Sequence, residues 1–158
     1  MQECETMTLQ TISDVPRKKW MAVLAKADWM LLKSAWKDSP IKPDYSYLRK
    51  AETGLVMVEG RMGGSGQPFN LGETTVTRCS VNLTSGEIGH AYIIGRNHEH
   101  AEIAAICDAL LQTDHNEAII DNIIAPLEKI KSLRDEEQSC KAAATKVDFF
   151  TVVRGEDE

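Results

Sequence analysis

The sequence predicts one α+β domain, in which an antiparallel β-meander of three to four strands is flanked by helices. Three observations support this prediction. The chain has 158 residues, of which 42% are hydrophobic and 27% are charged, and this suits a single globular core. Apolar and polar residues alternate in the middle of the chain, whereas apolar residues recur at helical spacing before and after it. The turns between the alternating segments are short, which favours hairpins.

Two short helices are expected at the start of this domain, which we place at residues 16–158 after an acidic, disordered extension over 1–15. Pro16, preceded by Ser13 and Asp14, is typical of a helix start, and apolar residues then recur to about residue 27. Asp28 can cap a second helix that ends before Pro40. The helices carry Trp20, Trp29 and Trp36. At least two of these tryptophans are expected in the core, although such apolar faces also dock onto partners.

Three strands are predicted after a linker over Pro40–Pro43. They cover Leu55–Arg61, Glu73–Leu83 and Glu87–Ile94. Alternation in the second strand directs Arg78 to one face. The opposite face carries Thr75, Thr77, Cys79, Val81 and Leu83.

Helices are predicted again in the C-terminal part of the chain. Asn97 caps a helix over about 98–112. Its buried face is expected to carry Ile103, Ile106, Cys107, Leu110 and Leu111. Its exposed face is expected to carry His98, Glu99, Glu102 and Asp108. A further helical segment should end or kink at Pro126 and resume to about Lys146. The extended tail Val147–Gly155 is a candidate fourth strand or a docking segment.

The net charge of −6 argues against a general nucleic-acid binder, which would present a basic face. Residues 16–50 are nevertheless basic, with nine bases and three acids. Residues 51–128 have no lysine, and their only cations are Arg61, Arg78 and Arg96. The planar arginine fork suits phosphate or carboxylate recognition, and structural ion pairs with neighbouring acids are an equally open interpretation.

A glycine-rich segment, Arg61–Phe69, follows the first predicted strand. Backbone N–H groups around Gly63, Gly64 and Gly66 can wrap an anion. The segment is neither a Walker loop nor a dinucleotide fingerprint, because no Gly-Lys-Ser/Thr and no helix follows. The alternative is a flexible hairpin loop that uses glycine for positive φ.

Other reactive residues indicate no autonomous chemistry. His98 and Glu102 share a helix face, but His100 points about 200° away, so one helix cannot present a metal site with all three. No nucleophile elbow is present, which argues against a self-contained hydrolase. Four irregularly spaced cysteines fit reduced thiols in the cytoplasm, and neither a secretory signal nor a membrane span is expected. These cysteines are Cys4, Cys79, Cys107 and Cys140.

Five blocks in register resemble one known family. The blocks are Arg17–Leu24, Ala51–Val56, Arg61–Gly66, Gly95–Arg96 with His100–Glu102, and Val147–Gly155. They are similar to PhnG, the small G subunit of the bacterial carbon–phosphorus lyase system. The resemblance runs from about residue 17 to 155, and residues 1 to about 15 have no counterpart that we recognise in that family.

The resemblance implies a subunit of a cytoplasmic hetero-oligomer with H, I and J subunits, used for growth on alkylphosphonates. With the H, I and L subunits, the G subunit supports transfer of a phosphonate to the ribose C1 of ATP, with release of adenine. The radical SAM subunit J cuts the carbon–phosphorus bond later, and the I subunit is the usual candidate for the nucleosidase chemistry. No catalytic residue carries over to this chain. ATP is implied as a substrate of the complex, with no cofactor, nucleic acid or membrane bound by this chain.

Two function hypotheses remain open at this stage: an accessory synthase subunit that is inactive alone, and a scaffold that never contacts substrate. The candidates for phosphate binding or a subunit interface are Arg61, Gly63, Gly64, Gly66, Arg78 and Arg96. The candidates for subunit docking are Trp20, Asp148, Phe149, Phe150 and Arg154. A nucleic-acid module is the least favoured class.

Overall fold

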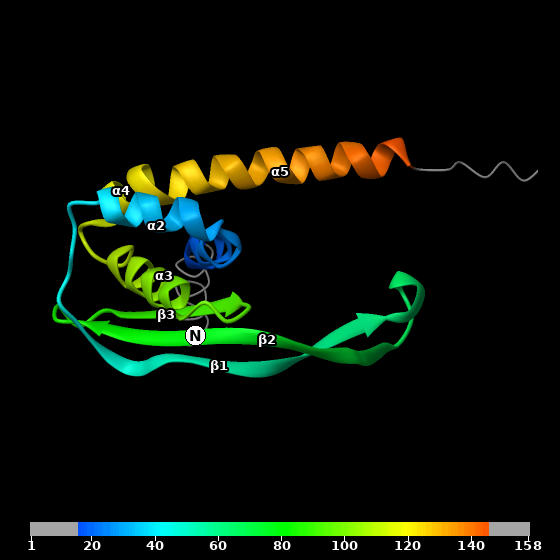
Figure 1. The fold of residues 1–158 in the computed structure, drawn as a ribbon, viewed down its shortest axis with the longest axis horizontal. Coiled ribbons are helices and arrows are strands. Elements are labelled where there is room, and N and C mark those ends of the chain that lie inside the picture. Colours follow the sequence, from blue (N-terminus) through cyan, green and yellow to red (C-terminus); the bar gives the residue numbers. More distant parts are fainter. Residues whose placement is uncertain (1–15, 146–158) are drawn as a thin grey trace, which may run out of the picture.

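The computed structural model describes residues 16–145, which form a three-stranded antiparallel sheet with helices on one side of it (Figure 1). A first helix spans 16–26. The later elements are α2 (Trp29–Asp38), β1 (Tyr45–Arg61), β2 (Pro68–Leu83), β3 (Ile88–Ile94), α3 (His98–Leu110), α4 (Asn116–Ile119), a π-helical turn (Ile120–Ile124) and α5 (Ala125–Ala144). This arrangement confirms the α+β class. The predicted extension over 1–15 and the tail Val147–Gly155 lie outside the described residues.

The two predicted N-terminal helices are present. The Asp28 side chain accepts hydrogen bonds from the backbone N–H groups of Met30 and Leu31, at 3.0 and 3.4 Å. Such a cap contributes about 1 kcal/mol by satisfying N–H groups that have no partner inside the helix. The second helix ends at Asp38, and the Ser39 N–H bonds back to the Ala35 and Trp36 carbonyls.

The sheet has the order β1-β2-β3, and β1 begins ten residues earlier than predicted, at Tyr45 rather than Leu55. Its pairing with β2 shifts register between Tyr47 and Arg49 and again between Arg49 and Glu52. These shifts interrupt the two-residue alternation that marks a strand in a sequence. Pairing with β2 holds the segment extended in spite of its charged residues.

The core lies between the sheet and α3. The predicted inward residues of β2 are buried, except that Thr75 is half-buried, and so is the predicted apolar face of α3. Gly89 of β3 permits this close packing, because an added Cβ would lie 1.9 Å from the Ala105 carbonyl oxygen. The three tryptophans are partly buried against the edge of this core.

The prediction that Asp108 faces solvent is wrong. Asp108 is 0% exposed, whereas His98 and Glu99 are exposed as expected. Helical spacing places Asp108 away from the main apolar face, but the N-terminal helix covers that side of α3. Arg17 and Trp20 on this helix bond the carboxylate.

The C-terminal helical segment changes from α-helical to π-helical hydrogen bonding immediately before α5. Pro126 lies in the first turn of α5 and has no backbone N–H to donate. The π-helical turn precedes it, so helical backbone continues through Pro126 instead of ending there. Leu127 is the only buried residue of α5. Among residues 16–145, no helix combines the length and hydropathy needed to cross a membrane.

Candidate functional site

Strands β1 and β2 extend well past β3 as a two-stranded ribbon (Figure 1). β3 ends at Ile94, opposite Val76 of β2, whereas the β1–β2 pairing continues to Arg61 opposite Pro68. We call residues 55–75 the hairpin arm. At a rise of ~3.3 Å per residue, its tip lies roughly 25 Å beyond the end of β3. Two-stranded ribbons are marginally stable alone in water, so the arm is a candidate contact surface.

The hairpin arm exposes large apolar side chains on both faces. Residues that pair across two strands point to the same face of the sheet. Leu55 and Met57 pair with Thr75 and Glu73, so they lie on the same face as Thr77, which α3 covers farther along the sheet. Val56 and Val58 lie on the other face. The exposed apolar residues of the arm are Leu55, Val56, Met57, Val58, Met62, Phe69 and Leu71. Apolar exposure on this scale is typical of an interaction surface.

The sheet face without helices carries further exposed apolar side chains on β3. The exposed fraction is 40% at Ile88, 54% at Tyr92 and 77% at Ile94. Alternation puts Gly89, Ala91 and Ile93 on the opposite, buried face. Figure 1 shows that the helices lie on that opposite side only. The apolar surface of the arm therefore extends onto the uncovered face of the sheet.

The glycine-rich segment forms the turn at the tip of the hairpin arm. Gly63 and Gly64 have φ values of 60° and 81°, which side chains other than glycine rarely adopt. A Cβ at Gly66 would lie 2.5 Å from the Met62 carbonyl oxygen. Each of these glycines thus has a structural role in the turn. Anion binding by this loop stays a prediction.

The three arginines of the lysine-free region lie at separate places. Arg61 is at the arm tip, where its Nη1 lies 3.5 Å from the Gly66 carbonyl oxygen. Arg78 Nε donates to Glu52 Oε1 at 2.7 Å, in the structural ion pair that the sequence left open. Contact with the Tyr92 hydroxyl, followed by that with Glu52, raises the pKa of Arg78. Arg96 lies between Gly95 and the first turn of α3, so Arg61 does not share one small anion with it within this chain.

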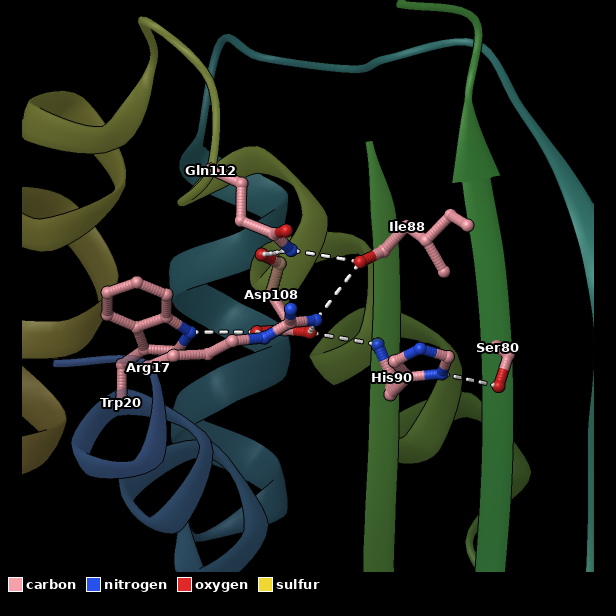
Figure 2. A network of polar contacts seen from close by, with 7 residues as sticks. All are labelled: Arg17, Trp20, Ser80, Ile88, His90, Asp108 and Gln112. Carbon is pink, nitrogen blue, oxygen red and sulfur yellow. Dashed lines mark hydrogen bonds and ion pairs between the residues drawn. The ribbon is translucent and has the colours of Figure 1, made fainter. Parts of the chain in front are cut away.

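A buried carboxylate fixes the basic N-terminal helix to the core (Figure 2). Arg17 donates to both Asp108 oxygens, at 3.2 Å from Nε and 2.7 Å from Nη2. Trp20 Nε1 donates to Asp108 Oδ1 at 2.8 Å, and the His90 backbone N–H donates to Oδ2 at 2.9 Å. Four donors therefore satisfy a fully buried charge. Trp20, a predicted docking residue, takes part in this internal network.

The histidines His90, His98 and His100 have separate partners. His98 Nε2 lies 2.8 Å from the Thr53 hydroxyl, whereas His100 is buried with its Nε2 2.9 Å from the Leu24 carbonyl oxygen. His90 Nδ1 lies 2.8 Å from the Ser80 hydroxyl. Within residues 16–145, no group of three or more His, Cys, Asp or Glu side chains is placed to hold a metal ion.

Glu102 instead joins two tyrosines of β1. The hydroxyls of Tyr45 and Tyr47 both donate to Glu102 Oε1, the second at 2.5 Å. Burial, followed by the hydrogen bond to Glu102, holds the pKa of Tyr45 far above its usual value, and the same carboxylate raises the pKa of Tyr47. Beside Tyr45 and Glu102 lies a cavity of about 550 Å³ between α2, the start of β1 and α3.

Comparison with known proteins identifies the family. The family described as phosphonate metabolism protein PhnG matches residues 15–155. The chain belongs to the PhnG family. One relative, from Rhizobium meliloti (strain 1021), is 43% identical over 141 residues, which cover 89% of this chain and 90% of the relative. That relative is named alpha-D-ribose 1-methylphosphonate 5-triphosphate synthase subunit PhnG. The resemblance inferred from the five sequence blocks is therefore confirmed.

The structure places parts of these PhnG-like blocks in contact and others apart. Leu24, from the first block, contacts His100, from the fourth block, and His100 Nε2 lies 2.9 Å from the Leu24 carbonyl oxygen. The Arg61–Gly66 block stands alone at the arm tip. Asp148, Phe149, Phe150 and Arg154 lie outside the described residues. Sequence reasoning missed the Asp108 network and the cavity beside Tyr45, although an acid within the apolar run Ile106–Leu111 was a usable signal for the first.

Proposed function

We propose that this chain is a subunit of an alpha-D-ribose 1-methylphosphonate 5-triphosphate synthase. The observation that carries the proposal is the identity of 43% with a relative of that name, over nearly the full length of both chains. Identity at this level across a whole domain supports a shared assembly as well as a shared fold. The exposed hairpin arm supports a role that depends on partners.

In the proposed reaction, a phosphonate oxygen forms a bond to the ribose C1 of ATP while the bond from C1 to adenine N9 breaks. The electron pair of the broken bond stays on N9, which takes up a proton as adenine leaves. The triphosphate remains on the ribose 5-oxygen. We assign the chain a supporting role in this transfer, together with the H, I and L subunits, and no catalytic residue.

Adenine release tests the proposed function. The purified chain with ATP and methylphosphonate should release no adenine, whereas the same chain mixed with the H, I and L subunits should release it. Omitting this chain from the mixture should abolish the reaction. Adenine release by the chain alone would contradict the supporting role, and full activity without it would contradict membership in the synthase.

We further propose that Arg61 and Arg96 contact the phosphate or phosphonate oxygens of the substrate. Among residues 16–145, Arg61 has one marginal hydrogen bond, to the Gly66 carbonyl oxygen, and Arg96 precedes the α3 N-terminus, where anions are favoured. Arg61→Ala and Arg96→Ala should leave the complex assembled and lower its turnover, since arginine stabilises charge on phosphoryl groups. Arg134→Ala, at an exposed ion pair on α5, is the matched control. Loss of assembly in the first two variants would indicate structural or interface roles instead.

The alternative is a pure scaffold, with the tail docking onto a sheet or groove of another subunit, such as H, I or J. Deleting residues 147–158 tests this idea in a pull-down with the other core subunits. Loss of their retention would support docking through the tail. Normal retention would refute docking through the tail, and the hairpin arm would then be the next interface to test.

A further inference from the structure

The cavity beside Tyr45 and Glu102 has the dimensions of a small-molecule site. Its volume of about 550 Å³ lies within the usual range for ligand pockets, roughly 300–1,000 Å³. It lies between α2 and α3, and Tyr45 at the start of β1 also lines it. None of the arginines predicted to bind anions lines it.

Three kinds of side chain converge on this cavity. Trp36 and Tyr45 contribute aromatic rings, and Ile103 and Ile106 contribute an aliphatic wall. Glu99 and Glu102 contribute carboxylates. The ammonium groups come from Lys33, Lys37 and Lys42. Aromatic rings stack on nucleobases, carboxylates accept hydrogen bonds from ribose hydroxyls, and ammonium groups attract phosphates.

The three lysines differ in their ion pairs and hydrogen bonds to other residues of the chain. Lys33 Nζ lies 3.0 Å from Glu99 Oε2 in an exposed ion pair. Lys42 Nζ bonds the Trp36 carbonyl and lies 4.2 Å from the centre of the Trp36 ring. Among residues 16–145, Lys37 forms no ion pair or side-chain hydrogen bond. Lys37 and Lys42 thus supply positive charge that no carboxylate within the described residues pairs with.

We propose that this cavity binds a nucleoside polyphosphate, with its base against Trp36 and Tyr45, its ribose beside Glu99 or Glu102, and its phosphates at Lys37 and Lys42. The inference rests on the proposed function for its choice of ATP as the probe. It assigns the chain a direct contact with substrate, which the scaffold alternative denies. The lysine-rich stretch 26–50 then has a role besides solubility.

Calorimetric titration of the full chain with ATP tests the proposal. ATP should bind, and both adenosine and inorganic tripolyphosphate should bind at least tenfold more weakly, because each lacks one half of the contacts. The double variant Lys37→Ala, Lys42→Ala should weaken ATP binding at least tenfold. Both lysines are exposed, so the circular dichroism spectrum should stay unchanged, and the melting temperature should fall only slightly because Lys42 loses its contacts with Trp36. Lys129→Ala, at an exposed position on α5, is the control and should bind ATP as the wild type does.

Several outcomes would overturn the inference. Unchanged ATP binding by the double variant would place any nucleotide elsewhere on the chain. Tripolyphosphate that binds as tightly as ATP would exclude recognition of the nucleoside, and no binding of ATP at millimolar concentration would exclude the site. Adenine release by the assembled subunits is a separate measurement. A chain that supports this release but binds no ATP would contradict the cavity proposal while preserving the proposed function.

Discussion

The same two strands, β1 and β2, run through two different environments. Near α3, the inward side chains of β2 are buried, with Val81 at 0% and Leu83 at 3% exposed. In the hairpin arm, Leu55 and Leu71 are 64% and 67% exposed. Both parts are rich in apolar and β-branched residues. The difference between them is the presence or absence of a covering layer among residues 16–145.

Apolar residues of the covered region stabilise the isolated chain, whereas those of the arm are available to bind a partner. Burial of an apolar side chain stabilises by roughly 25 cal/mol per Å² removed from water, so only the covered part gains this energy in the isolated chain. No element within residues 16–145 covers the apolar side chains of the arm, so they would gain this energy when a partner covers them. Substitutions in the covered region should therefore change the free energy of unfolding, and substitutions in the arm should change the retention of partner subunits.

The largest effect on stability is expected from Asp108→Ala in the covered region. The substitution leaves Arg17 and Trp20 without their shared acceptor, and it empties a fully buried position. Arg17 keeps 30% side-chain exposure and can recover some hydration, so we expect a loss of about 3 kcal/mol in the free energy of unfolding, near the lower limit for a broken buried pair. Urea denaturation measures it. Asp121→Ala, at an exposed aspartate, should change the midpoint little, and an equal loss there would refute the special role of Asp108.

The next largest effect is expected from a pair of glycine substitutions. Gly89→Ala would force a Cβ against the Ala105 carbonyl oxygen, so α3 must move away from β3. We expect a loss of about 1–3 kcal/mol, as for other overpacked cores. Gly54→Ala, next to the arm on β1, meets no atom within 4 Å and should have little effect. Similar melting temperatures for the two variants would contradict the close packing described for the covered region.

In the covered region, local sequence patterns predicted some features and missed others. The spacing of Ile103, Ile106 and Leu110 predicts the α3 face, and Asn97 predicts its start. The inward residues of β2 follow from simple alternation. The first ten residues of β1 were missed because register shifts break that alternation. The burial of Asp108 was missed because it depends on the N-terminal helix, which lies 88 to 91 positions away in sequence.

In the candidate sites, too, the sequence predicted local features but not contacts between distant parts of the chain. Glycine spacing alone identified the turn at Gly63 and Gly64, because positive φ is a local property. Arg78 was left between two interpretations, and its partner Glu52 appears only once the β1–β2 register is known. The cavity beside Tyr45 depends on three elements that meet only in the tertiary structure. Local sequence patterns contain no information on such a meeting.

A smaller, pH-dependent effect is expected at His100, where α3 contacts the N-terminal helix. Burial lowers the pKa of His100 below its usual value of 6.5, although the Leu24 carbonyl partly opposes this. The unfolded chain therefore binds a proton more readily than the folded chain as pH falls below about 6.5, and stability must decrease in that range. His100→Gln keeps a donor for Leu24 but does not titrate. Its free energy of unfolding should depend less on pH between 7 and 5, and equal slopes for both proteins would exclude His100 as the source.

The smallest effect on stability, and a large effect on assembly, is expected from the arm. Leu55→Thr, Met57→Thr and Leu71→Thr replace side chains that are at least 60% exposed, and threonine retains the preference for strands. Each should change the free energy of unfolding of the isolated chain by less than about 0.5 kcal/mol. The triple variant should nevertheless lose most retention of the other subunits in a pull-down, because it removes apolar area that nothing within residues 16–145 covers and that we expect a partner to cover. Leu133→Gln, at a 58% exposed position on α5, tests whether any exposed leucine has this effect. Normal retention by the triple variant would show that the arm's apolar side chains are exposed for some reason other than subunit contact.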